Sequence, residues 1–164
     1  MTQVNRKQQV VELLKAIETG AAEPVGYINA DNYKQHNLLI GDGLAGFGEA
    51  LQALPAGSAR VNTVRVFQDG DYVFAHTDYN FFGDKIGFDI FRFENGKIVE
   101  HWDNLQEKPN QPNPSGRTMT DGTTEVKDLD KTEANKTLVQ NFVEDILVNG
   151  KMERLAQYFD WDNY

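Results

Sequence analysis

His101 and Asp103 stand two positions apart in the stretch GKIVEHWDNL (residues 96–105), which has the composition of a β-strand. Side chains at positions i and i+2 share one face of a strand, so these two are expected side by side, with Trp102 on the opposite face. An imidazole beside a carboxylate can take up and release a proton near neutral pH. The pair is a candidate for general acid–base catalysis, with a structural ion pair at the end of a strand as the alternative.

Asp89 is a third candidate, because it lies on the strand that comes just before this one along the chain. It alternates with Phe91 and Phe93, and this Phe-rich face is expected to be the buried one. The Asn-Gly pair that follows favours a tight hairpin turn, which places Asp89 and Asp103 at similar distances from the turn. The sequence therefore predicts two carboxylates and His101 in one apolar cavity, where burial raises the pKa of a carboxyl group and a nearby imidazolium lowers it.

Other residues are expected to complete this pocket. His36 is a further catalytic candidate, and the expected ligand-lining residues are His76, Tyr33, Phe91 and Trp102. Three of these residues also have a purely structural interpretation. His36 could cap backbone carbonyl groups, His76 could be a cross-strand partner, and Trp102 could serve packing or a dimer face.

Several other kinds of site are not supported by the sequence. Three histidines with several acids allow a metal site, but no two of them have a tight ligand spacing such as His-x-x-x-His, so no metal is expected. The stretch GDGLAGFG lacks the preceding strand and the lysine of a phosphate-binding loop. Ser58 and Ser115 both lie in loop-like contexts, which disfavours a serine triad. The expected site is therefore free of metal and cofactor.

The hydrophobic pattern of the first 107 residues changes once, from a helical period to a strand period. Apolar residues at helical spacing in the first 20 residues predict an amphipathic helix, and two shorter helical pieces are expected after Pro24 and at 43–54. Four strand-like segments then follow, separated by turn signals: 60–68, 72–83, 84–94 and 97–107. Helices followed by a hairpin-linked meander predict an α+β fold, with the helices packed on one face of a curved antiparallel sheet.

The rest of the chain divides into two parts. Residues 108–131 are rich in Pro, Asn, Gly, Ser and Thr and are expected to form a linker, whereas 132–164 return to a helical pattern. KQQVVELLKAI (7–17) aligns without gaps on KTLVQNFVEDI (136–146), and YINADNY aligns on YFDWDNY at the end of the chain. The last segment is therefore expected to be the helical start of a second, incomplete copy of residues 1–107.

Composition excludes several partners. A net charge of −9 over 164 residues disfavours nucleic acid and anionic membrane surfaces. The chain has no cysteine, which excludes disulfides and thiolate chemistry. Its first residues lack the continuous apolar run of a signal peptide, and no stretch approaches the roughly 20 apolar residues of a membrane span. A cytoplasmic location is expected.

The run DIFRFENGKIVEHWD, preceded by helices and by QHN, resembles the SnoaL-like polyketide cyclase family of the NTF2-like superfamily over roughly residues 4–107. The resemblance implies a cone, in which a strongly curved antiparallel sheet wraps around helices and a pocket lies at the wide end. It implies an acid–base aspartate at Asp103, a pocket histidine at His36 and a polar pocket position at Asp89, where these cyclases tend to have histidine. The C-terminal segment is similar to the start of the second domain in tandem SnoaL-like proteins.

The resemblance also implies a reaction. Such cyclases close a ring by intramolecular aldol condensation without metal or cofactor, and here Asp103 would remove a proton α to a carbonyl group while His101, His36 or Asp89 donates to the enolate oxygen. The departure at position 89 leaves the choice among cyclase, lyase and isomerase chemistry open, on a small apolar carbonyl compound. The alternative is a non-catalytic NTF2-like module that holds a small ligand or forms a homodimer through its sheet.

Overall fold

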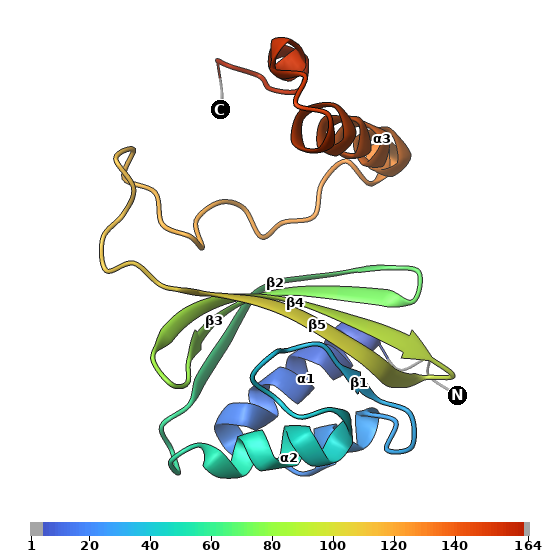
Figure 1. The fold of residues 1–164 in the computed structure, drawn as a ribbon, viewed down its shortest axis with the longest axis vertical. Coiled ribbons are helices and arrows are strands. Elements are labelled where there is room, and N and C mark those ends of the chain that lie inside the picture. The colour runs from blue at the N-terminus through green and yellow to red at the C-terminus, as the bar shows by residue number, and fades with distance from the viewer. Residues whose placement is uncertain (1–4, 163–164) are drawn as a thin grey trace. The chain divides into compact units, whose positions relative to one another are not determined.

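The computed structural model describes residues 5–162 and has the α+β architecture that the sequence predicts (Figure 1). The chain forms two compact units, residues 1–124 and residues 125–164, and the division falls inside the predicted linker. Val4, one of the apolar residues at helical spacing in the first 20, lies outside the described residues, as do the last two residues of the predicted second copy.

The described part of the first unit, residues 5–124, contains two α-helices and one short 3₁₀ helix: α1 (Arg6–Thr19), the 3₁₀ helix (Glu23–Tyr27) and α2 (Gly43–Ala53). The side chain of Asn5 caps the start of α1 by accepting a hydrogen bond from a backbone N–H of the first turn. Gly20 ends the helix with a φ of 71°, a left-handed conformation that glycine adopts at low cost. The expected apolar stripe of α1 is buried, with Val10 fully inaccessible to solvent.

Four long antiparallel strands form the predicted meander: β2 (Arg60–Asp69), β3 (Tyr72–Asn80), β4 (Asp84–Glu94) and β5 (Lys97–Glu107). A fifth, two-residue strand, β1 (Lys34–Gln35), pairs in parallel with β5, so the sheet is mixed and has the order β1-β5-β4-β3-β2. The sequence did not predict β1, because two residues are too few to show a period.

The register of β4 and β5 sets the positions of the candidate residues. Asp89 is paired with Asp103, and Phe91 with His101, so all four side chains lie on the same face of the sheet. This is the face that α1 and α2 cover (Figure 1). The hairpin argument from the sequence is confirmed for these residues.

The chain between the 3₁₀ helix and α2 brings further polar groups to that face. It runs extended through β1, and Asp42 accepts a hydrogen bond from the backbone N–H of Gln35 at 2.8 Å. The loop then packs backbone to backbone on α2: a Cβ on Gly46 would lie 1.9 Å from the carbonyl oxygen of Gly41. Only glycine fits at position 46, and this close approach holds the loop against the helix.

Part of the predicted linker belongs to the first unit. The guanidinium of Arg65 on β2 donates to the backbone carbonyl oxygens of Thr120, Asp121, Gly122 and Thr123. Four charge-assisted hydrogen bonds from one side chain fix this segment on the outer face of the sheet, which is the face that α1 and α2 do not cover. The compact unit accordingly continues to residue 124.

The second unit is helical throughout its regular part. It consists of a short 3₁₀ helix (Leu129–Lys131), α3 (Thr132–Phe142), a π-helical segment (Val143–Val148) and a second 3₁₀ helix (Met152–Gln157). Among residues 5–162, no helix combines the length and the apolar character needed to cross a membrane.

Each of the two units contains a tyrosine–carboxylate hydrogen bond and a short side-chain turn. The tyrosines that the sequence alignment pairs both donate their hydroxyls to carboxylates, Tyr27 to Glu12 and Tyr158 to Asp145, although the alignment does not pair Glu12 with Asp145. Two residues further on, the side chain of Asn29 accepts from the backbone N–H of Asp31. Asp160 accepts from the backbone N–H of Asp162 in the same way.

Candidate active site

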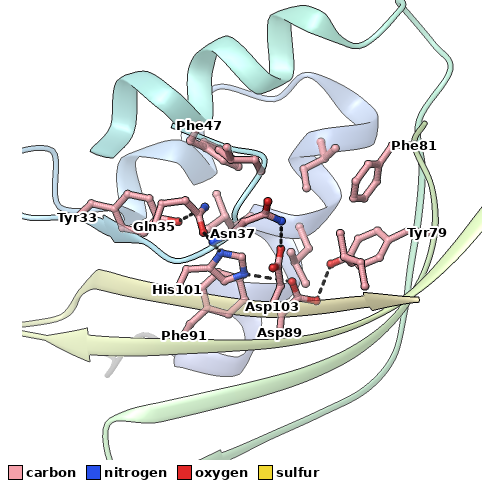
Figure 2. Close-up of a pocket in the computed structure, with 15 residues that line it drawn as sticks. Tyr33, Gln35, Asn37, Phe47, Tyr79, Phe81, Asp89, Phe91, His101 and Asp103 are labelled. Atoms are coloured by element: carbon pink, nitrogen blue, oxygen red, sulfur yellow. Dashed lines mark hydrogen bonds and ion pairs between the residues drawn. The ribbon is translucent and has the colours of Figure 1, made fainter. Parts of the chain in front are cut away.

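A small cavity lies between the helices and the covered face of the sheet (Figure 2). Its volume is about 60 Å³. One part of its wall is apolar and comes from α1, α2, the loop before α2 and the ends of β3 and β5: Leu13, Leu14, Ile17, Ile40, Phe47, Phe81 and Leu105. The other part holds the polar side chains of Tyr33, Gln35, Asn37, Tyr79, Asp89, His101 and Asp103.

Asp89 is the more deeply buried of the two carboxyl groups of the wall, with 2% of its surface exposed. Its Oδ1 lies 3.1 Å from Nε2 of His101, and its Oδ2 accepts a hydrogen bond of 2.8 Å from the hydroxyl of Tyr79. Both carboxyl oxygens are therefore partnered, as a buried carboxyl group requires.

Tyr79 reaches Asp89 because residue 87 on β4 is glycine. A Cβ at Gly87 would lie 2.4 Å from Cε2 of the Tyr79 ring, so the ring occupies the space that any other side chain would fill. Burial, and next the charge of Asp89, raise the pKa of Tyr79 well above its ordinary value. Tyr79 therefore keeps its proton and acts as a hydrogen-bond donor to Asp89 at neutral pH.

His101 is held between three groups. Its ring stacks on Phe91 with 4.4 Å between centroids, its Nε2 faces Asp89, and its Nδ1 lies 3.0 Å from Oε1 of Gln35. Only 9% of its side chain is exposed. The imidazole is thus fixed in orientation on all sides except the one that lines the cavity.

Asp103 has a different environment from Asp89. It is only partly buried, and its Oδ2 accepts a hydrogen bond of 2.6 Å from the side-chain amide of Asn37. Within the described part of the chain, its Oδ1 makes no hydrogen bond. A carboxylate with one free oxygen at an apolar cavity can accept a proton from a bound molecule. The nearby wall residue Tyr33 has a raised pKa, because of its burial first and next because of the charges of Asp103 and Asp89.

Five of the predicted residues meet at this cavity, and three do not. Asp103, His101, Asp89, Tyr33 and Phe91 line it. His36, Trp102 and His76 lie on the other face of the sheet, which corrects their expected place in the pocket. His36 is exposed and stacks on Trp102 with 4.9 Å between centroids and 2° between planes.

His36 has a hydrogen-bond partner on that outer face. Its Nε2 lies 2.9 Å from Glu100, whose other oxygen accepts from Arg92. The hydrogen bond from His36, and also that from Arg92, lower the pKa of Glu100. The outward direction of His36 follows from alternation along residues 33–37, because its two neighbours at 35 and 37 face the cavity.

His76 packs among outer-face residues as well. It stacks on Phe88 and its Nδ1 accepts from Arg65 at 3.1 Å, which leaves the hydrogen on Nε2. That Nε2 is buried without a hydrogen-bond partner among the described residues. Burial and the charge of Arg65 lower the pKa of His76. Its cross-strand, structural interpretation fits this environment.

Sequence reasoning missed Gln35, Asn37 and Tyr79. Gln35 and Asn37 alternate with Tyr33, and that alternation is the one signal that could have identified them. Tyr79 contacts Asp89 only because of the space above Gly87, and no sequence pattern marks such a contact.

The cavity wall also contains the only cluster of potential metal-binding side chains in the described ranges. Ligand atoms of Asp89, His101 and Asp103 lie within 4.8 Å of one another. The tight sequence spacing that metal sites often show is absent because the three residues come from two neighbouring strands. A cation there would have to replace the hydrogen between His101 and Asp89.

Comparisons with known proteins agree with this fold. Residues 10–101, more than half of the chain, match the SnoaL-like domain family. No protein with a curated description matches the chain. Among solved structures, an NTF2-like protein of unknown function from Cytophaga hutchinsonii aligns with a TM-score of 0.55 and 16% identity, over 64% of this chain and 93% of that one.

Two further solved structures are similar in fold. One is a proposed polyketide cyclase from Bacillus cereus, with a TM-score of 0.51 and 20% identity over 59% of this chain and 71% of that one. The other is a proposed ketosteroid isomerase from Kribbella flavida, with a TM-score of 0.55 and 11% identity over 74% and 94%. The fold is thus of the NTF2-like type, and the chain belongs to the family of SnoaL-like domains.

Proposed function

We propose that the cavity of residues 1–124 is the active site of an acid–base enzyme that removes a proton α to the carbonyl group of a small apolar compound. One observation carries the proposal: Asp103, with a free carboxyl oxygen, lies opposite a buried His101–Asp89 pair at the same apolar cavity. Two ionisable groups in contrasting environments are the usual basis for separate acid and base roles.

Each group has a defined task in this mechanism. The carboxylate of Asp103 takes the α-proton, and the electron pair of the C–H bond moves toward the carbonyl oxygen. The proton shared by His101 and Asp89 passes to that oxygen, which gives an enol. In the second half of the reaction the enol O–H hydrogen returns to the His101–Asp89 pair as the carbonyl group re-forms. Transfer of the first proton from Asp103 to another carbon then gives an isomer, whereas attack of the enol carbon on a second carbonyl group, whose oxygen takes that proton from Asp103, gives an aldol product. Neither route needs a cofactor.

The cavity limits the substrate. About 60 Å³ is far below the roughly 300–1,000 Å³ of pockets for drug-sized ligands. The part of the substrate that enters the cavity is therefore small, of the size of a ketone head group. Apart from the carbonyl group, this part of the substrate contacts the apolar side chains of the wall. Exclusion of water by Leu13, Phe47 and Leu105 would strengthen the electrostatic interactions at the reacting atoms.

Deuterium exchange tests this proposal without knowledge of the natural substrate. Small apolar ketones such as cyclohexanone and 2-pentanone are incubated with the protein in D₂O, and loss of the α-proton signal is followed by NMR. The wild-type protein should accelerate exchange, and the rate with Asp103→Asn should be about 10²–10⁴-fold lower. Asp78→Asn is the matched control, since Asp78 is a β3 carboxylate that pairs with Lys108 outside the cavity. Equal rates for wild type and Asp103→Asn would refute the proposal.

A second candidate is a non-catalytic module that dimerises through its sheet. It is favoured by the outer face, where a groove of about 650 Å³ is lined by Phe67, Tyr72, Phe74, Ile90 and Trp102. Phe67 and Tyr72 are 52% and 48% exposed. Two copies related by a twofold axis present the same apolar patch to each other, so a homodimer would cover both.

Sedimentation equilibrium separates this second function from a monomeric enzyme. Phe67→Lys should shift a dimer toward monomer by placing two cations across the twofold axis, whereas Leu38→Lys, at a fully exposed loop position, should not. A monomer at all concentrations would remove the dimerisation function. α-Proton exchange by the same monomer would leave the enzymatic one in place.

A further inference from the structure

The side-chain amide of Gln35, in the cavity wall, has its orientation fixed from both ends. Its Oε1 accepts a hydrogen bond of 3.0 Å from the backbone N–H of Asn37, which can only donate. Its Nε2 donates to the hydroxyl of Tyr33 at 3.2 Å. The amide oxygen, and not the nitrogen, is therefore the group that faces His101.

This orientation determines where His101 carries its hydrogen. The same Oε1 of Gln35 lies 3.0 Å from Nδ1 of the imidazole, and two acceptors cannot form a hydrogen bond with each other. Nδ1 must therefore bear a hydrogen. A carbonyl oxygen has two lone pairs, so Gln35 can accept from Asn37 and from His101 at once.

A consequence follows at the opposite side of the ring. With Nδ1 as the N–H, a neutral imidazole presents the lone pair of Nε2 to Asp89 Oδ1, 3.1 Å away. One hydrogen must lie between these two atoms, because a lone pair facing a carboxylate is repulsive. The single hydrogen of the Tyr79 hydroxyl is already directed at the other oxygen of Asp89.

We propose that Gln35 is a positioning residue, which holds His101 in the tautomer with its hydrogen on Nδ1 and thereby places one transferable proton between Nε2 and Asp89 at the cavity. The value of that proton for catalysis rests on the function proposed above. The tautomer itself does not, because the hydrogen bonds alone determine it. Gln35 acts on the reaction through His101 and not by touching the substrate.

NMR of the full chain labelled with ¹⁵N-histidine tests the tautomer directly. The chain has three histidines, so His36→Gln and His76→Phe assign the spectrum by removal of one signal set each. His101 should show a protonated Nδ1. An Nδ1 that carries no hydrogen in the wild-type protein would overturn the inference before any variant is made.

Variants of Gln35 test its role. Gln35→Leu removes the acceptor and should move the hydrogen of His101 from Nδ1 to Nε2, whereas Gln35→Glu keeps an acceptor oxygen and should retain the hydrogen on Nδ1. Gln68→Leu is the control, because Gln68 on β2 donates only to the carbonyl oxygen of Gly70 and should leave the His101 signals unchanged. An unchanged Nδ1–H in Gln35→Leu would refute the positioning role. If that variant does not fold, the wild-type spectrum and Gln35→Glu still decide.

The exchange assay separates this inference from the proposed function. Gln35→Leu should lower α-proton exchange by roughly tenfold or more, a part of the 10²–10⁴ that acid–base catalysis contributes, with recovery in Gln35→Glu. The expected tautomer with no exchange activity in wild type would refute the enzymatic function and leave the tautomer assignment standing. Full activity in a Gln35→Leu variant whose tautomer has changed would refute the catalytic part of the inference.

Discussion

Asp89 on β4 lies directly opposite Asp103 on β5, yet the two carboxyl groups have no hydrogen-bond partner in common. Asp89 faces His101 and Tyr79 in a buried position, and Asp103 faces Asn37 in a partly buried one. Like charges opposite each other on paired strands are unfavourable, and separate partners are what make the arrangement tolerable.

The first prediction concerns the hydrogen between His101 and Asp89. Asp89→Asn should change the free energy of unfolding by less than about 1 kcal/mol, because its Nδ2 can donate to Nε2 of His101 while its Oδ1 accepts from Tyr79. Asp89→Leu leaves both partners unsatisfied and should cost about 2–4 kcal/mol. Urea unfolding measures both. An Asp89→Asn variant as unstable as Asp89→Leu would show that His101 Nε2 itself donates.

Gly87 provides the second prediction. In Gly87→Ala the new methyl group meets the Tyr79 ring at 2.4 Å, so the ring must move and its hydrogen bond to Asp89 must lengthen or break. Overpacking together with a lost buried hydrogen bond should cost about 2–4 kcal/mol of unfolding free energy. Gly26→Ala is the matched control, because its Cβ would meet nothing within 4 Å. Equal stability of the two variants would contradict this account of the Tyr79 position.

The sequence was sufficient for the part of the site that two long strands carry. Alternation along β4 and β5, with an Asn-Gly turn between them, placed Asp89, His101 and Asp103 on one buried face, as the structure confirms. Hairpin register is a local property, so short-range patterns determine it. The α+β order of elements followed from the same periods.

The remaining part depends on contacts between segments far apart in the chain. β1 exists only because it pairs with β5, about 66 residues further on, and it is β1 that turns Gln35 inward and His36 outward. β3 has apolar residues on both faces, so its alternation does not indicate which face the helices cover, and the predicted pocket position of His76 could not be checked from the pattern. In each case a tertiary contact, not local preference, determines the direction of the side chain.

The third prediction is a pH dependence that His76 causes. Burial, and next Arg65, lower the pKa of His76 below its ordinary value of about 6.5, although Asp78 acts in the opposite direction. Around and below pH 6.5 the unfolded chain therefore binds more protons at this site than the folded chain, and the unfolding free energy falls as the pH falls. His76→Phe keeps a ring against Phe88 and removes this dependence.

Chemical denaturation at pH 8 and pH 5.5 checks this linkage. The unfolding free energy of His76→Phe relative to wild type should be higher at pH 5.5 than at pH 8, because only wild type loses stability through this group. The denaturant m-value should be the same for both proteins, since the surface exposed on unfolding is nearly unchanged. A difference independent of pH, or one of opposite sign, would contradict the assigned direction of the His76 pKa.

The fourth prediction concerns metal. In the proposed mechanism the hydrogen between His101 and Asp89 does the work, so α-proton exchange by protein treated with a chelator should equal that of untreated protein. Added Zn²⁺ should inhibit, because it can occupy the ligand atoms of Asp89, His101 and Asp103 and displace that hydrogen. Loss of activity on chelation, with recovery on addition of a divalent ion, would replace the acid–base assignment with a metal-assisted one.

The fifth prediction concerns residues 132–164, which we propose to be the helical start of a second SnoaL-like copy. The side-chain turns of Asn29 and Asp160 at aligned positions support this proposal, and the aligned tyrosines Tyr27 and Tyr158 both donate to a carboxylate. In the second unit Asp145 is the acceptor for Lys151, Arg154 and Tyr158, and these hydrogen bonds, that of Lys151 first, hold its pKa far below the ordinary range.

One substitution should therefore loosen the second unit without affecting the first. Asp145→Asn should speed hydrogen exchange of the α3 amides, since three donors lose a charged acceptor, while exchange in β3 and β4 stays unchanged because the two units are separate compact bodies. Glu153→Gln, an exposed acid in the adjacent 3₁₀ helix, is the control and should alter neither. The depressed pKa of Asp145 gives the pH direction: the bonds contribute stability above its unfolded value near 4, which is lost as the pH falls toward its folded value. If the α3 amides of Asp145→Asn exchange no faster than those of wild type, Asp145 does not stabilise this unit. The same conclusion holds if the protection of the α3 amides in wild type does not fall at acid pH.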